Sequence, residues 1–149
     1  MRLSKNFTLK EFTRSGTARR LGIDNNPNDD QVQNIKDQVE NLLQPLRDRI
    51  GCVITINSGF RNRLLNKMIG GAFHSQHISG HASDIDVSCM SLEEVYKIIV
   101  SEFDFDKVIF EFGEWIHVSY VKGSNRKIAL VAKKIYGSTV YREYNGEFA

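Results

Sequence analysis

The longest regular pattern of hydrophobic positions runs from residue 29 to residue 50, where apolar side chains recur every three or four positions. This spacing puts them on one side of a helix, so it predicts a long amphipathic helix buried along one face. Pro45 lies inside the pattern. Because proline has no backbone N–H to donate, we expect the helix to kink or restart there. The apolar positions are Val32, Ile35, Val39, Leu42, Leu43, Leu46 and Ile50.

Shorter helices are predicted by their first residues. Thr8 with Glu11, and Ser91 with Glu94, are capping-box pairs that favour helix starts. The segment after Ser91 has apolar residues at helical spacing, so this second amphipathic helix should pack against the back of a sheet. A short helix is predicted over residues 62–68, and the stretch between the first and the long helix is rich in turn-forming residues.

Segments rich in β-branched or alternating apolar residues predict the strands. We expect a hairpin turn at residues 123–125 before the last of them, and from Lys133 onward either an added edge strand or a frayed tail. Together with the helices, these segments predict an α+β fold in which helices pack on one side of a mostly antiparallel sheet. The predicted strands cover residues 52–57, 84–87, 108–112, 115–121 and 127–132.

The 149 residues are enough for one domain with a hydrophobic core, and no composition shift marks a second. We expect a helical N-terminal portion over about residues 1–50, a sheet portion over about residues 51–133 and a C-terminal tail. No stretch approaches the length of a membrane span, and the first residues lack the apolar core of a signal peptide. We therefore expect a monomer that is cytoplasmic as synthesised and does not bind membranes.

Composition narrows the partners only slightly. Hydrophobic residues make up 41% of the chain and charged residues 26%, which is typical of a folded globular protein. The formal net charge of +2 and the lack of a basic tract argue against a nucleic-acid partner. Cys52 and Cys89 are too few for a disulfide framework and form no C-x-x-C pair, so we expect buried free thiols.

Alternation along two predicted strands brings candidate ligands to one side of the sheet. If Ile85 and Val87 face the core, Asp84 faces the open side. By the same alternation His117 lies on the open face of a neighbouring strand. His77 precedes Asp84 across a glycine-containing loop that can fold back to bring the imidazole and the carboxylate together.

Two imidazoles and one carboxylate, with a fourth position left to water, are the ligand set of a catalytic zinc site. Hydrolysis also needs a group that moves a proton near that water. Glu114, three residues before His117, is the nearest candidate, and Glu111 is the alternative. His74 and His81 lie close along the chain, but we do not expect them to be ligands.

The motifs in this region resemble those of the zinc D-Ala-D-Ala carboxypeptidase group of bacterial and phage cell-wall peptidases, family M15. The similarity covers most of the chain and is closest to the short, single-domain branch of that family. Its main elements are Ser75-x-His77-x-x-Gly80-x-Ala82-x-Asp84 and Glu114-x-x-His117, supported by Leu3–Thr8, Leu9-x-x-Phe12, Gly22–Asn25, Pro45–Arg47 and Ser58–Arg61.

The resemblance implies a hedgehog/DD-peptidase-like fold in which His77, Asp84 and His117 bind one zinc ion. It further implies that Glu114 is the general base and later acid, and that Arg61 stabilises the developing oxyanion. The implied activity is hydrolysis of a peptide bond in peptidoglycan stem peptides, either as a D-Ala-D-Ala carboxypeptidase or as an L-Ala-D-Glu endopeptidase. Such an enzyme without a signal peptide fits a phage endolysin that depends on another factor to be released to the cell wall during lysis, and it fits a recycling or virion-associated enzyme nearly as well.

A second hypothesis comes from a different class of protein. A zinc-containing module of this fold could bind cell-wall peptides without hydrolysing them. A structural zinc site normally fills its fourth position with a protein ligand. The three-ligand pattern with a nearby carboxylate therefore favours the enzyme.

Overall fold

The computed structural model describes residues 1–149. The helices, in chain order, are α1 (Leu9–Thr13), α2 (Gly16–Leu21), α3 (Asp29–Gln38), the π-helical turn η1 (Val39–Leu43), α4 (Gln44–Ile50), α5 (Arg63–Met68) and α6 (Leu92–Glu102). The strands are β1 (Ile54–Ser58), β2 (Ala82–Val87), β3 (Lys107–Glu111), β4 (Trp115–Ser119), β5 (Ile128–Ile135) and β6 (Ser138–Glu143). No helix is both long and apolar enough to cross a bilayer.

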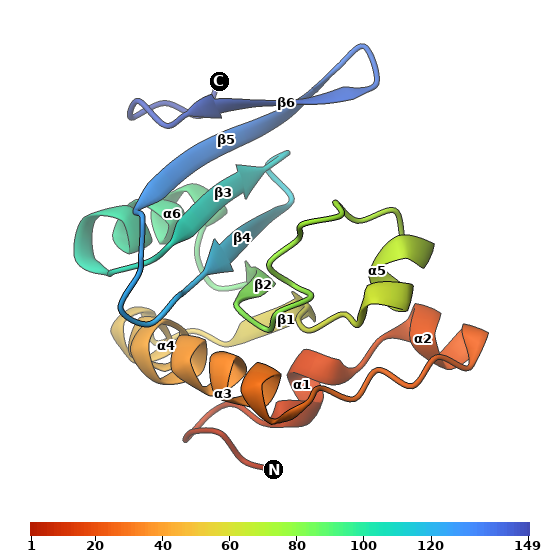
Figure 1. Ribbon diagram of the computed structural model, residues 1–149. Coiled ribbons are helices and arrows are strands. Elements are labelled where there is room, and N and C mark those ends of the chain that lie inside the picture. The colour runs from red at the N-terminus through yellow and green to blue at the C-terminus, as the bar shows by residue number, and fades with distance from the viewer.

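All six strands form one sheet in the order β1-β2-β4-β3-β5-β6. Every neighbouring pair is antiparallel except β3 and β5, which are parallel. In Figure 1 the sheet runs from β1, close to α1, to the β5–β6 pair at its other end, and α6 lies against its middle strands. The predicted α+β class with a mostly antiparallel sheet is confirmed.

The hairpin predicted at residues 123–125 is wrong. Both edges of β4 are already paired, with β2 and with β3, so β4 has no free edge for the next strand. The chain instead returns to the start of β3, where Lys127 N–H donates to the Phe105 carbonyl at 3.1 Å and Ile128 N–H to the Asp106 carbonyl at 2.9 Å. From there β5 runs parallel to β3 along its open edge.

The segment after Lys133 is an edge strand and not a frayed tail. Tyr136 and Gly137 form the two-residue turn between β5 and β6, both with positive φ (50° and 81°), as tight hairpins require. Six residue pairs join the two strands, from Leu130 opposite Glu143 to Ile135 opposite Ser138. The sheet therefore extends about ten residues beyond the predicted boundary near residue 133.

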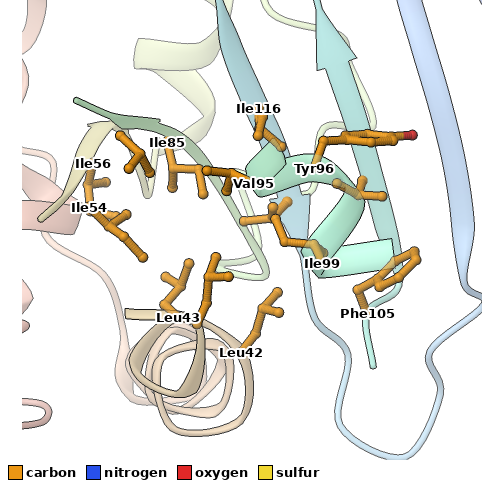
Figure 2. Packing of buried hydrophobic residues seen from close by; sticks show 14 of the residues in the cluster. Leu42, Leu43, Ile54, Ile56, Ile85, Val95, Tyr96, Ile99, Phe105 and Ile116 are labelled. Carbon is orange, nitrogen blue, oxygen red and sulfur yellow. The ribbon is translucent and has the colours of Figure 1, made fainter. Parts of the chain in front are cut away.

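The helix predicted over residues 29–50 is continuous from α3 through η1 to α4. Pro45 stands in the first turn of α4, directly after the π-helical turn. At this position the changed hydrogen-bond pattern of the π-helical turn accommodates a residue that has no backbone N–H to donate. Figure 2 shows Leu42 and Leu43 of η1 facing the β1 and β2 isoleucines, beside side chains of α6. In the stretch predicted as turns, α2 is a helix begun by Ser15 and ended by Gly22 with a φ of 67°.

Cys52 and Cys89 form a disulfide, so the expectation of free thiols is wrong. Cys52 precedes β1 and Cys89 follows β2, and these strands pair antiparallel. Pairing therefore brings the two Cα atoms within 5.9 Å, a separation common for disulfides. The low cysteine count could not reveal this proximity, because it results from strand pairing across 37 residues.

Candidate metal and active site

Asp84 and His117 lie side by side on the open face of the sheet. They are direct partners in the β2–β4 register, and directly opposed residues project to the same face. His117 Nδ1 lies 3.1 Å from Asp84 Oδ1. The face predicted from alternation along the two strands is therefore the face observed.

His77 reaches the same point from the loop before β2. Its side chain is only 3% exposed, and its Nδ1 lies 2.7 Å from the carbonyl oxygen of Gly59. Because a carbonyl can only accept, Nδ1 carries the proton and Nε2 keeps its lone pair. Nε2 points to the cluster and lies 3.4 Å from Asp84 Oδ1. Histidines that bind a metal through one ring nitrogen usually donate the N–H of the other to a carbonyl or carboxylate, and the Gly59 carbonyl fills that role here.

The three side chains form a cluster that can hold one metal ion. One donor atom from each of His77, Asp84 and His117 lies within 4.8 Å of the others. Burial opposes ionisation of Asp84, but interactions with the neighbouring imidazoles, chiefly the hydrogen bond with His117, outweigh it and hold the pKa of Asp84 well below its usual value. The carboxylate is thus ionised at neutral pH, as a metal ligand must be.

Helix α3 anchors the loop that carries His77. The side-chain amides of Gln31, Asn34 and Gln38 donate to the backbone carbonyls of residues 78, 79 and 80 at 3.2, 2.8 and 2.9 Å. This contact does not follow from the apolar positions of the helix, on which the prediction of its buried face rests. The signal was present as three amide residues at spacings of three and four, which put them on one helix face.

Arg61 lies beside the cluster, where the residues after β1 leave the sheet. Its Nη2 is 3.6 Å from Asp84 Oδ2, while Nε donates to Ser58 Oγ at 3.1 Å and Nη1 to Asn66 Oδ1 at 3.0 Å. Its backbone N–H also donates to the His77 carbonyl. The guanidinium group is therefore held in one orientation next to the cluster.

The cluster opens into a cavity of about 730 Å³. Its walls come from the open face of the sheet on one side and from the loop at residues 69–77 on the other. They include Arg61, His77, Asp84, Glu111, Phe112, Trp115, His117, Lys134 and Tyr141. A cavity of this size can take several residues of an extended peptide.

The two glutamates considered as proton carriers occupy different places. Glu111 is the last residue of β3 and lines the cavity. Burial and the nearby Asp84 carboxylate raise the pKa of Glu111, partly offset by His117, Arg61 and Lys134. Glu114 is in the β3–β4 turn, exposed, and is not among the residues that line the cavity.

The remaining histidines lie outside the cluster. His81 Nδ1 lies 2.6 Å from Ser79 Oγ, and exposed His74 stacks edge-on against Phe73 with ring centroids 4.8 Å apart. Trp115 lines the cavity beside Phe112, with ring centroids 5.5 Å apart. The aromatic pair gives the cavity an apolar wall next to its charged floor.

Comparison with known proteins agrees with this geometry. One segment of 44 residues is 46% identical to the zinc D-Ala-D-Ala carboxypeptidase of Streptomyces albus G. The match covers 29% of this chain and 17% of that protein, so the chain corresponds to only a fraction of the relative's length. A family model described as Peptidase M15 matches residues 5–119, which include all three members of the cluster. The chain therefore belongs to the M15 peptidase family.

Proposed function

We propose that this protein is a zinc-dependent peptidase that hydrolyses a peptide bond in peptidoglycan stem peptides. The observation that supports it most directly is the His77, Asp84 and His117 cluster at the base of a peptide-sized cavity. Three protein donors leave a fourth position open, which distinguishes a catalytic zinc site from a structural one. Membership in M15 and the named activity of the Streptomyces relative support the substrate class.

A zinc ion held by these three residues would act as a Lewis acid that polarises the scissile carbonyl and makes water a better nucleophile at neutral pH. Glu111 is the residue we propose as general base and then acid. It would take the proton from the attacking water and pass it to the leaving amine nitrogen. The raised pKa of Glu111 favours this role, because a more basic carboxylate accepts a proton more readily.

Arg61 is proposed to stabilise the negative charge that develops on the carbonyl oxygen. Its guanidinium group is fixed by Ser58 and Asn66 before any substrate arrives, so no reorganisation is needed during the reaction. The contact with Asp84 is longer than a normal hydrogen bond, at 3.6 Å. One N–H group of Arg61 thus remains free for an incoming oxygen.

Metal analysis combined with a product assay tests this function. The zinc-loaded protein should contain about one zinc per chain and release D-Ala, or new amino groups, from stem peptides. Treatment with a chelator should abolish release, and added zinc should restore it, because the cluster alone cannot polarise the carbonyl. The released product identifies the bond as D-Ala-D-Ala or L-Ala-D-Glu. Zinc binding without any product would contradict the proposal and favour a peptide-binding module.

A further inference from the structure

The β5–β6 hairpin builds part of the cavity although it lies beyond residue 119, where the family match ends. Four of its residues line the cavity, namely Leu130, Lys134, Thr139 and Tyr141. Their register explains why. Leu130 pairs with Ile109, which pairs on its other side with His117, so Leu130 lies in the same row as the metal cluster. Two residue pairs further along the hairpin than Ala132 and Tyr141, Lys134 pairs with Thr139. The hairpin thus continues the open face of the sheet away from the metal cluster.

Lys134 is a cation without a carboxylate partner. It takes part in none of the ion pairs of the structure. Its Nζ donates to Thr139 Oγ1 at 2.8 Å and lies 5.2 Å from the centroid of the Phe112 ring. A neutral hydroxyl and an aromatic face orient the ammonium group, and no carboxylate forms an ion pair with it.

Tyr141 supplies a hydrogen-bond donor next to this cation. It shares a row across the sheet with Glu111, because Glu111 pairs with Ala132 and Ala132 pairs with Tyr141. Burial, and then the Glu111 carboxylate, raise the pKa of Tyr141. Like that of any ordinary tyrosine, its phenol is protonated at neutral pH and can donate a hydrogen bond to an anion.

We infer that Lys134 and Tyr141 form a carboxylate-binding subsite for the substrate, which sets the specificity of the cleavage. This inference rests on the proposed function, because it takes the occupant of the cavity to be a stem peptide. Stem peptides carry free carboxylates, at the α-position of their γ-linked D-Glu and at the C-terminus. An ammonium group and a phenol O–H are suitable partners for such a group.

The spacing along the sheet limits which carboxylate can bind. Lys134 lies two strands away from His117 and four residues further along, so their Cα atoms are about 16 Å apart for ordinary strand spacings. An extended peptide advances about 3.3–3.6 Å per residue. The bound carboxylate must therefore lie several residues from the scissile carbonyl. In a D-Ala-D-Ala cleavage the distant carboxylate is the α-carboxylate of D-Glu, and in an L-Ala-D-Glu cleavage it is the C-terminal carboxylate, so the carboxylate that the subsite holds indicates which bond is cleaved.

Binding measurements can test the subsite without turnover. The protein is zinc-loaded Glu111→Gln, which should bind substrate but not hydrolyse it. The probes are the peptide L-Ala-γ-D-Glu-L-Lys-D-Ala-D-Ala and two analogues, each with one carboxylate amidated. We expect the analogue that lacks the carboxylate held by the subsite to bind about tenfold more weakly than the acid peptide. Lys134→Ala in the same background should bind the acid and this amide equally. Lys134→Arg should retain the difference.

Two further lysines make the test specific. Lys133 is adjacent to Lys134 but alternates to the other face of β5 and does not line the cavity, so Lys133→Ala should leave the acid–amide difference unchanged. Lys107 lines the cavity on the other side of His117. Equal binding of acid and amides, or loss of the difference in Lys107→Ala and not in Lys134→Ala, would overturn the inference.

Turnover separates this inference from the proposed function. In the parent enzyme background, Lys134→Ala should raise KM about tenfold, since it removes a binding contact with the substrate carboxylate. If the zinc-loaded parent releases no product from any stem peptide, the proposed function fails. If the parent is active and Lys134→Ala has unchanged KM, only the subsite fails.

Discussion

Glu111 and Glu114 are only three residues apart, yet they face different surroundings. Strand β3 ends at Glu111, whose side chain points along the open face with Trp115 opposite it. The turn that follows contains Phe112, with a positive φ of 60°, and Gly113, with a φ of 70°. This turn directs Glu114 to the surface. Spacing from His117 along the sequence favours Glu114 as the base, whereas position in the cavity favours Glu111.

Substitution of each glutamate distinguishes them. Glu111→Gln should lower kcat by about 10²–10⁴, the usual contribution of a general base, and should retain the zinc. Glu114→Gln should stay within about twofold of the parent, because its side chain is exposed outside the cavity. Steady-state hydrolysis of a stem peptide, with zinc content measured for each variant, gives the comparison. Loss of activity in Glu114→Gln alone would assign the role to Glu114.

At the level of elements, the decisive contact is between α3 and the His77 loop. Gly80 lies against the backbone of the helix with a φ of 82°, and a Cβ placed there would be 2.6 Å from the Gln31 carbonyl oxygen. The loop therefore needs glycine at this position to lie close enough to α3 for the side-chain amides of the helix to reach its carbonyls. The distance of His77 from Asp84 depends on this packing.

Gly80→Ala should push the loop away from α3 and weaken metal binding. We expect unfolding free energy to fall by more than about 1–2 kcal/mol, the cost of a left-handed backbone for a residue with a Cβ, and zinc affinity to fall with it. Gly123→Ala is the matched control, since its φ is 78° but no atom lies within 4 Å of the added Cβ. Urea unfolding and zinc competition on both variants test this. Equal zinc affinity in the two variants would contradict it.

Across the whole molecule, the disulfide closes a segment that supplies two of the three metal-binding candidates. The segment from Cys52 to Cys89 contains Arg61, His77 and Asp84, and His117 lies outside it. A cross-link over 37 residues restricts the unfolded chain far more than the folded one, in which β1 and β2 already pair.

Removal of the disulfide should therefore reduce stability. For a loop of this length we expect Cys89→Ser to lower the free energy of unfolding by about 3–4 kcal/mol. Cys89 is exposed, so the substitution removes the bond without leaving a cavity in the core. Denaturant unfolding of the variant and of the parent, each with and without reductant, gives the measurement. Reductant should destabilise the parent and leave the variant unchanged; a parent insensitive to reductant would contradict the prediction.

Much of the fold follows from local chemistry. Side-chain period distinguishes the long helix from the strands, and strand alternation puts Asp84 and His117 on the open face, because each depends only on residues close in the sequence. The M15 resemblance likewise rests on short motifs that remain visible in the chain. These features could be predicted without knowing which segments meet.

Tertiary structure decided the rest. Which edge β5 pairs with, whether Cys52 meets Cys89 and which glutamate faces the cavity all depend on contacts between segments far apart in the chain. Local patterns do not encode these contacts, since one alternating strand fits any free edge equally well. The sequence by itself determined the elements and the candidate ligands, and packing of the sheet determined the cavity in which they can act together.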